Sequence, residues 1–187
     1  AAFNTALWRL RKLLAREPRS DGGQNLRTYG SEIVLEKAPW LTIDTHFFAS
    51  AVKQRMESES VAEVSARMAV LESAIRNYAG PFLEGEDADW ILEERERLHS
   101  LYVRAESELM RCYGCNECYE DAIAAARRIL AADPFRESVF RSRALLFVLN
   151  GQRGKALSHY EQWRAAFRAE LGIDPMPQTM RLAEDIR

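Results

Sequence analysis

Three cysteines near the middle of the chain are the side chains most suited to metal or redox chemistry. Cys112, Cys115 and Cys118 follow the spacing C-x2-C-x2-C, and thiolates at this spacing bind zinc or an iron–sulfur cluster when a fourth ligand is supplied. No fourth ligand stands nearby. Cys112 also continues an apolar stripe at helical spacing, which consists of Leu98, Leu101, Ala105 and Leu109. We therefore expect Cys112 in the core and no bound metal or cofactor, with metal or redox sensing as the alternative.

The remaining candidates for catalysis lack the partners that catalysis requires. His46, His99 and His159 are scattered, and none has a Ser or Cys nucleophile with a plausible third member nearby. No glycine-rich phosphate loop occurs. Carboxylates gather between Glu84 and Glu96, but we interpret them as a solvated loop and helix start, with Asp89 capping the helix. No enzyme is predicted.

Two further local patterns are interpreted as structural. Arg136 and Glu137, after a turn, predict an ion pair at a helix start. Tyr160, Trp163 and Phe167 recur at helical spacing and are expected to pack in the interior.

Composition favours a soluble, cytoplasmic protein. The chain has 187 residues, of which 47% are apolar, and this length can build one large or two small cores. No apolar run approaches the roughly 20 residues of a membrane span, and no signal segment opens the chain. The net charge is −2, but residues 1–30 carry +4 and the rest −6. This asymmetry predicts a basic module joined to an acidic one.

The basic end contains the stretch FNTALWRLRKLL at residues 3–14, which predicts an amphipathic helix. Its apolar face consists of Phe3, Ala6, Leu7, Leu10, Leu13 and Leu14. Its opposite face consists of Asn4, Thr5, Arg9, Arg11, Lys12 and Arg16, with Trp8 at the centre. An indole among cations on the solvent side of a helix requires a binding partner.

A β-hairpin is predicted after this helix. Turn-forming residues at 19–25 indicate a loop. Strands are expected from Leu26 to Tyr29 and from Glu32 to Lys37, and Ile33 and Leu35 should lie on a buried face. Ala38, Pro39 and Trp40 interrupt the second strand, and from Thr45 onward the pattern predicts helices only.

Basic helix, loop and hairpin in this order resemble the last part of a winged-helix DNA-binding domain of the OmpR type, found in response regulators and in the Streptomyces antibiotic regulatory protein family. That family carries a pattern close to "rLRkaL" in its recognition helix, here at residues 8–14. The resemblance implies double-stranded DNA as a partner, with the helix in the major groove and the hairpin as the wing. The implied contacts are Asn4, Thr5, Trp8, Arg9, Arg11, Lys12, Arg16, Arg27 and Thr28. Alternatively, Trp8 packs on a neighbouring domain or a twofold mate.

The chain begins at the recognition helix, whereas a winged helix rests that element on earlier helices. We therefore expect a fragment of a longer polypeptide that binds DNA weakly or not at all by itself.

The second part of the chain shows an internal repeat. Ala122 and Ala156 are 34 residues apart, as are Tyr113 and Phe147, and 34 is the tetratricopeptide period. Asp133 with Pro134, and Asp174 with Pro175, are expected to close the two units. A third, divergent hairpin is predicted from Phe47 to Met56 and from Val61 to Tyr78. Its inner stripe would consist of Leu71, Ala74, Ile75 and Tyr78.

An ordered motif series runs through the same region: GPFL, DW, ERERL, DPFRE, AL-x2-Y and ELG-x-DP-x-P-x-T. This series resembles the bacterial transcriptional activation domain of the same antibiotic regulators. The resemblance implies an all-helical, tetratricopeptide-like module that mediates homodimer formation on repeated half-sites and contacts RNA polymerase.

The predicted fold is therefore mainly α, with a partial winged helix over residues 1–43 and a helical repeat domain over 44–187. The predicted function is a sequence-specific transcriptional activator. The alternative is a repeat scaffold that binds protein or small ligands without binding DNA itself.

Overall fold

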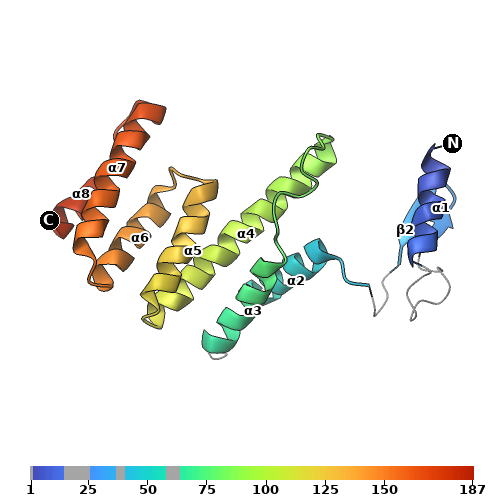
Figure 1. Ribbon diagram of the computed structural model, residues 1–187, viewed down its shortest axis with the longest axis horizontal. Helices are drawn as coiled ribbons and strands as arrows, with labels where there is room; N and C mark the ends of the chain where they lie inside the picture. Colours follow the sequence, from blue (N-terminus) through green and yellow to red (C-terminus); the bar gives the residue numbers. More distant parts are fainter. Residues whose placement is uncertain (1, 15–25, 37–40, 58–63) are drawn as a thin grey trace. The chain divides into compact units, whose positions relative to one another are not determined.

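The computed structural model describes residues 2–14, 26–36, 41–57 and 64–187. The chain divides into two compact units, Ala1–His46 and Phe47–Arg187. The first contains a helix and a two-stranded sheet, and the second contains helices in every described element, which confirms the predicted fold class (Figure 1). The elements are α1 (Ala2–Leu14), β1 (Leu26–Tyr29), β2 (Glu32–Leu35), α2 (Asp44–Glu57), α3 (Val64–Arg76), α4 (Asp89–Cys115), α5 (Tyr119–Ala132), α6 (Glu137–Leu149), α7 (Arg153–Leu171) and α8 (Pro177–Ile186).

In the first unit, β1 and β2 pair antiparallel with Leu26 opposite Leu35. The turn places Gly30 at its first central position with φ of 61°, which the primed hairpin turns require and which glycine adopts without a Cβ clash. The predicted buried face is only partly realised, because Leu26 is buried but Leu35 is 38% exposed. The predicted loop at 19–25 and the break at 38–40 lie outside the described residues.

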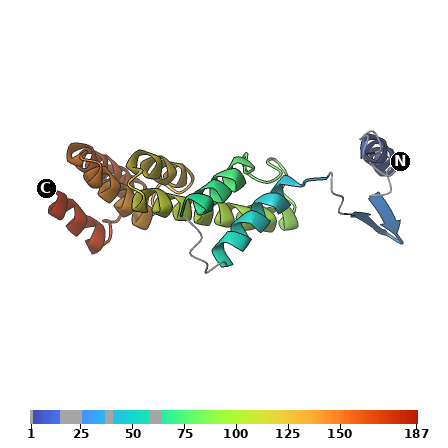
Figure 2. The same ribbon diagram turned by 90° about the horizontal axis from the view of Figure 1, so that it is seen from below.

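In the second unit, each helix packs against the next in chain order from α3 to α8, and α8 also contacts α6 (Figure 2). The predicted repeat is confirmed by equivalent positions. Ala122 on α5 and Ala156 on α7 are both fully buried, and Tyr113 on α4 and Phe147 on α6 pack in the same cluster with them. Small side chains at these positions let neighbouring helices approach closely.

The third hairpin is built from α2 and α3, which pack on α4 from Leu98 to Tyr113. Leu71 and Ala74 of its predicted stripe are fully buried, and Tyr78 stacks on Tyr102 of α4 with ring centroids 4.5 Å apart. Phe48 from α2 completes the cluster. The expected helix start at Val61 lies outside the described residues, and α3 begins at Val64.

The start of α4 differs from the prediction. Ala88 is the N-cap and no side chain caps this end, so the expected cap by Asp89 is wrong. Asp89 is instead the first helical residue, where its charge still suits the helix dipole. The preceding loop is fastened by Arg95, whose guanidinium donates to the carbonyls of Phe82, Leu83 and Glu86.

At the carboxyl end, α8 is bonded to the start of α6. The Glu137 carboxylate accepts from the Met176 amide and from the Thr179 hydroxyl, and it lies 3.9 Å from Arg141. The predicted ion pair between Arg136 and Glu137 is therefore wrong. The prediction for the aromatic residues of α7 is confirmed, because Tyr160 and Phe167 are buried and Trp163 stacks on Phe140. No helix in the described ranges is both long and apolar enough to cross a membrane.

Candidate nucleic-acid interface

The polar face of α1 is open to solvent. Arg9, Arg11 and Lys12 are exposed, as are Asn4 and Thr5. The helix carries no acidic residue, so its cations receive no compensation from α1 itself. Thirteen residues form a helix about 20 Å long, and the major groove of DNA is wide enough to admit an α-helix.

Trp8 lies on this face and is 59% exposed. The Lys12 ammonium sits 4.8 Å from the centroid of its indole ring, a cation–π arrangement that holds both side chains on the outer surface of the helix. The indole therefore does not belong to the core of its own unit. It is available to a partner, whether DNA or another protein surface.

A hydrogen bond joins the helix to the hairpin. The Arg11 guanidinium donates to the Thr28 hydroxyl on β1 at 2.8 Å. Leu7 and Leu14, the half-buried members of the apolar face, lie on the same edge of the helix as Arg11. Two residues predicted as separate DNA contacts are thus brought together, and the hairpin orients the arginine.

The outer face of the hairpin is less basic than its sequence indicates. The Arg27 guanidinium forms an ion pair with Glu36 at 3.1 Å, and the Tyr29 hydroxyl donates to the same carboxylate. Arg27 is opposite Val34 in the register, so Glu36 is its diagonal neighbour on one face of the hairpin. The predicted phosphate contact at Arg27 is therefore partly neutralised within the protein.

The apolar face of α1 remains largely uncovered in the described residues. Phe3 is 67% exposed, Leu13 61% and Leu10 43%. Among the predicted contacts, Arg16 lies outside the described residues, and the contact role of the whole set stays a prediction.

The family of the chain is decided by its second unit. The model of the bacterial transcriptional activator domain matches residues 43–187. The chain belongs to this family. The match confirms the resemblance to the antibiotic regulators, and it covers every described helix from α2 to α8.

Relatives of this activator domain are transcriptional regulators. The regulatory protein AfsR of Streptomyces griseus is 26% identical over 195 residues, covering 100% of this chain and 18% of AfsR. The transcriptional regulatory protein MoaR1 of Mycobacterium tuberculosis is 25% identical over 154 residues, covering 76% of this chain and 46% of MoaR1. The chain therefore spans less than half the length of either relative.

Solved structures show the same fold. Mycobacterium tuberculosis EmbR, in complex with a low-affinity phosphopeptide, matches with a TM-score of 0.75 and 22% identity, over 99% of this chain and 48% of that chain. The C-terminal TPR-containing domain of a Plasmodium falciparum FK506-binding protein matches with a TM-score of 0.53 and 14% identity, over 76% and 87%. The activator domain is thus a tetratricopeptide-like helical array.

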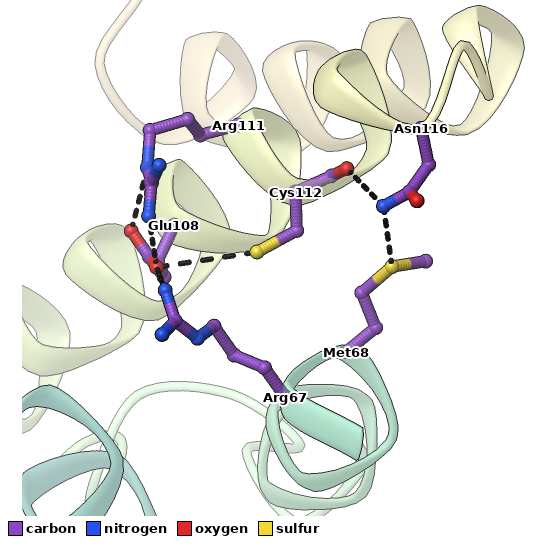
Figure 3. Close-up of polar contacts among 6 residues, drawn as sticks. All are labelled: Arg67, Met68, Glu108, Arg111, Cys112 and Asn116. Atoms are coloured by element: carbon purple, nitrogen blue, oxygen red, sulfur yellow. Dashed lines mark hydrogen bonds and ion pairs between the residues drawn. The ribbon is translucent and has the colours of Figure 1, made fainter. Parts of the chain in front are cut away.

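The cysteines of the activator domain do not form a metal centre among the described residues, where no group of three His, Cys, Asp or Glu side chains is placed to hold an ion. Cys112 is buried, as predicted, while Cys115 and Cys118 are exposed. Figure 3 shows the Cys112 thiol directed at the Glu108 carboxylate, with its sulfur 3.9 Å from a carboxylate oxygen. The same carboxylate accepts hydrogen bonds from Arg67 and Arg111. Burial and the Glu108 charge raise the pKa of Cys112, which disfavours the thiolate that a metal needs.

Sequence reasoning missed Glu36 and Tyr29 as members of this surface. The signal was available in the hairpin register, because a two-residue turn at Gly30 and Ser31 fixes which residues share each face. A single glutamate in a predicted strand nevertheless gives no periodic pattern that singles it out.

Proposed function

We propose that the chain is part of a sequence-specific DNA-binding transcriptional activator, in which α1 enters the major groove and the β1–β2 hairpin acts as its wing. One observation carries the proposal. A helix with three exposed cations, no acid and an exposed indole is hydrogen-bonded to a following hairpin.

The roles follow from the chemistry of each side chain. Arg9, Arg11 and Lys12 supply donors for phosphate oxygens or guanine edges. Asn4 and Thr5 supply hydrogen bonds near bases. Trp8 offers a flat apolar surface to sugar atoms or a thymine methyl. Thr28 presents Arg11 from the wing, and Arg27 contributes once Glu36 is displaced or compensated.

The activator domain supplies the remaining functions in this proposal. Membership of the family supports self-association of protomers on repeated half-sites and a surface for RNA polymerase. The regulators AfsR and MoaR1 support the assignment to transcription. A protein that acts on the bacterial chromosome works in the cytoplasm.

The test is a titration of the full-length natural polypeptide against its own upstream region by fluorescence anisotropy. Each phosphate contact lowers the slope of log K against log salt by about 0.9. Measurements at about 50 and about 200 mM salt should therefore show a steep loss of affinity. Sedimentation velocity over the same concentrations tests self-association.

Matched variants locate the surface. Arg11→Ala and Lys12→Ala should each weaken binding and make the negative slope of log K against log salt shallower by about one. Arg104→Ala is the control, because Arg104 is an exposed arginine of α4, outside the first unit. If the wild type and both variants bind DNA with equal affinity, α1 is not the helix that contacts the major groove. If the wild type binds no DNA, a repeat scaffold is left as the function.

A further inference from the structure

Arg143 occupies an unusual position for an arginine. It lies on α6 with its guanidinium 5.3 Å from the centroid of the Phe147 ring, and the same ring stacks on His159 of α7 with centroids 5.1 Å apart. The Arg143 Nε is buried and has no hydrogen-bond partner in the described part of the chain. The two Nη nitrogens are not among the buried atoms and form no hydrogen bond to a described residue, so they are the donors that a ligand can reach.

The helix pairs bring further cations to the same level. In the pair α5 and α6, Arg127 and Arg143 are each eight residues from Phe135 in the connecting turn. In the pair α6 and α7, Arg143 and His159 are each eight residues from Gly151 in the connecting turn. Residues equidistant from a turn lie side by side in antiparallel helices, and α6 packs against both α5 and α7. Figure 1 shows these three helices side by side.

The charges that shift the pKa values of Arg143 and His159 are positive. Burial and then the charge of Arg127 lower the pKa of Arg143. Burial, Arg143 and Lys155 lower the pKa of His159. Among the described residues, no hydrogen bond or ion pair joins Arg127, Arg143, Lys155 or His159 to a carboxylate. Uncompensated cations stand out in this part of the chain, because residues 31–187 carry a net charge of −6.

We propose that Arg127, Arg143, Lys155 and His159 form a binding site for a phosphate monoester, with the Arg143 guanidinium as its central donor. A phosphate monoester carries nearly two negative charges at neutral pH and accepts several hydrogen bonds. It therefore balances most of the charge of two arginines and a lysine. The guanidinium fork also matches phosphate oxygens in geometry. The site is independent of the proposed DNA surface, since every residue in it belongs to α5, α6 or α7.

The test uses the three histidines of the chain as reporters. The carbon-bound proton signals of His46, His99 and His159 are followed by NMR through a pH titration, in chloride and in inorganic phosphate at equal ionic strength. A bound anion near His159 should raise its pKa by about one pH unit. His46 and His99, which lie on α2 and α4, should titrate equally in both salts.

Two variants show whether the arginines bind the anion. Arg127→Gln removes an exposed cation and should weaken the phosphate effect on His159 about ten- to hundredfold in half-saturating concentration. Arg143→Gln should do the same, with circular dichroism to verify folding. Arg104→Gln, an exposed arginine on α4, is the control and should leave the response unchanged.

The sources of the phosphate group are compared in the same assay with a phosphoserine peptide and with adenosine monophosphate. Either one acting at lower concentration than inorganic phosphate supports the site and identifies its ligand class. The proposal is overturned if His159 titrates identically in chloride and phosphate, or if the control variant weakens the response as much as Arg127→Gln. It is also overturned if duplex DNA alone moves the signal, which would assign the cluster to the nucleic-acid backbone.

Discussion

The ion pair between Glu106 of α4 and Arg128 of α5 allows a sharp test of how the repeat is stabilised. Glu106 is fully buried, whereas 41% of the Arg128 side chain is exposed. The guanidinium donates to both carboxylate oxygens at 2.5 and 2.9 Å. Burial and then the Glu106 charge raise the pKa of the neighbouring Tyr102 hydroxyl to about 12, which keeps this hydroxyl a donor to the carboxylate.

The two single substitutions should differ in cost because the two partners differ in burial. Arg128→Met leaves a fully buried carboxylate without its cation, which costs about 3–5 kcal/mol of unfolding free energy. Glu106→Gln leaves an arginine that reaches water, so its cost should be about 1–2 kcal/mol. The difference of about 2 kcal/mol corresponds to about 1 M in the urea midpoint.

Equilibrium urea unfolding of the chain measures both values, with unchanged m-values as the sign that the unfolded state is comparable. The double variant Glu106→Leu with Arg128→Met should be more stable than Arg128→Met alone, since no unpaired charge remains. Arg104→Met controls for loss of an exposed arginine and should stay within about 0.5 kcal/mol of wild type. A Glu106→Gln variant as unstable as Arg128→Met would refute the burial argument.

Three further outcomes follow from contacts described above. Glu36→Gln releases Arg27 from its ion pair, so the salt slope of DNA binding by the full-length protein should steepen by up to about one, measured by anisotropy. His159 has a lowered pKa in the folded chain, so the unfolded chain takes up the proton first as the pH falls. The free energy of unfolding therefore decreases below about pH 6.5. His159→Gln should reduce this decrease, measured as the difference between the urea midpoints at about pH 7.5 and about pH 5.5. Glu137→Gln weakens the bonds to Thr179 and should cost about 2 kcal/mol, with faster limited proteolysis ahead of α8.

The helical part of the chain could be predicted because its pattern is repetitive. Apolar residues at helical spacing, such as those from Leu98 to Cys112, lie on one face of a helix, and this face is buried. The 34-residue spacing repeats the same pattern in the next helix pair. The hairpin followed from the turn at Gly30 and Ser31. Its buried face was overestimated at Leu35, because burial depends on what covers a strand rather than on the strand.

The polar contacts could not be predicted in the same way. Asp89 has the residue type of a cap, but the chain enters α4 through Ala88, so the cap position is occupied one residue earlier. Glu137 binds α8, which lies about forty residues further along the chain. Arg127, Arg143 and His159 recur every 16 residues, a signal that becomes informative only when the turns between the helices are known.

The unequal burial of Glu106 and Arg128 also bears on how this helix contact changes during evolution. Loss of either partner first is an unfavourable step, so the two positions should covary among homologous sequences. Losing Glu106 first lowers the free energy of unfolding less than losing Arg128 first. Homologous sequences that have lost one partner should therefore keep the basic residue at the position of Arg128 more often than the carboxylate at the position of Glu106.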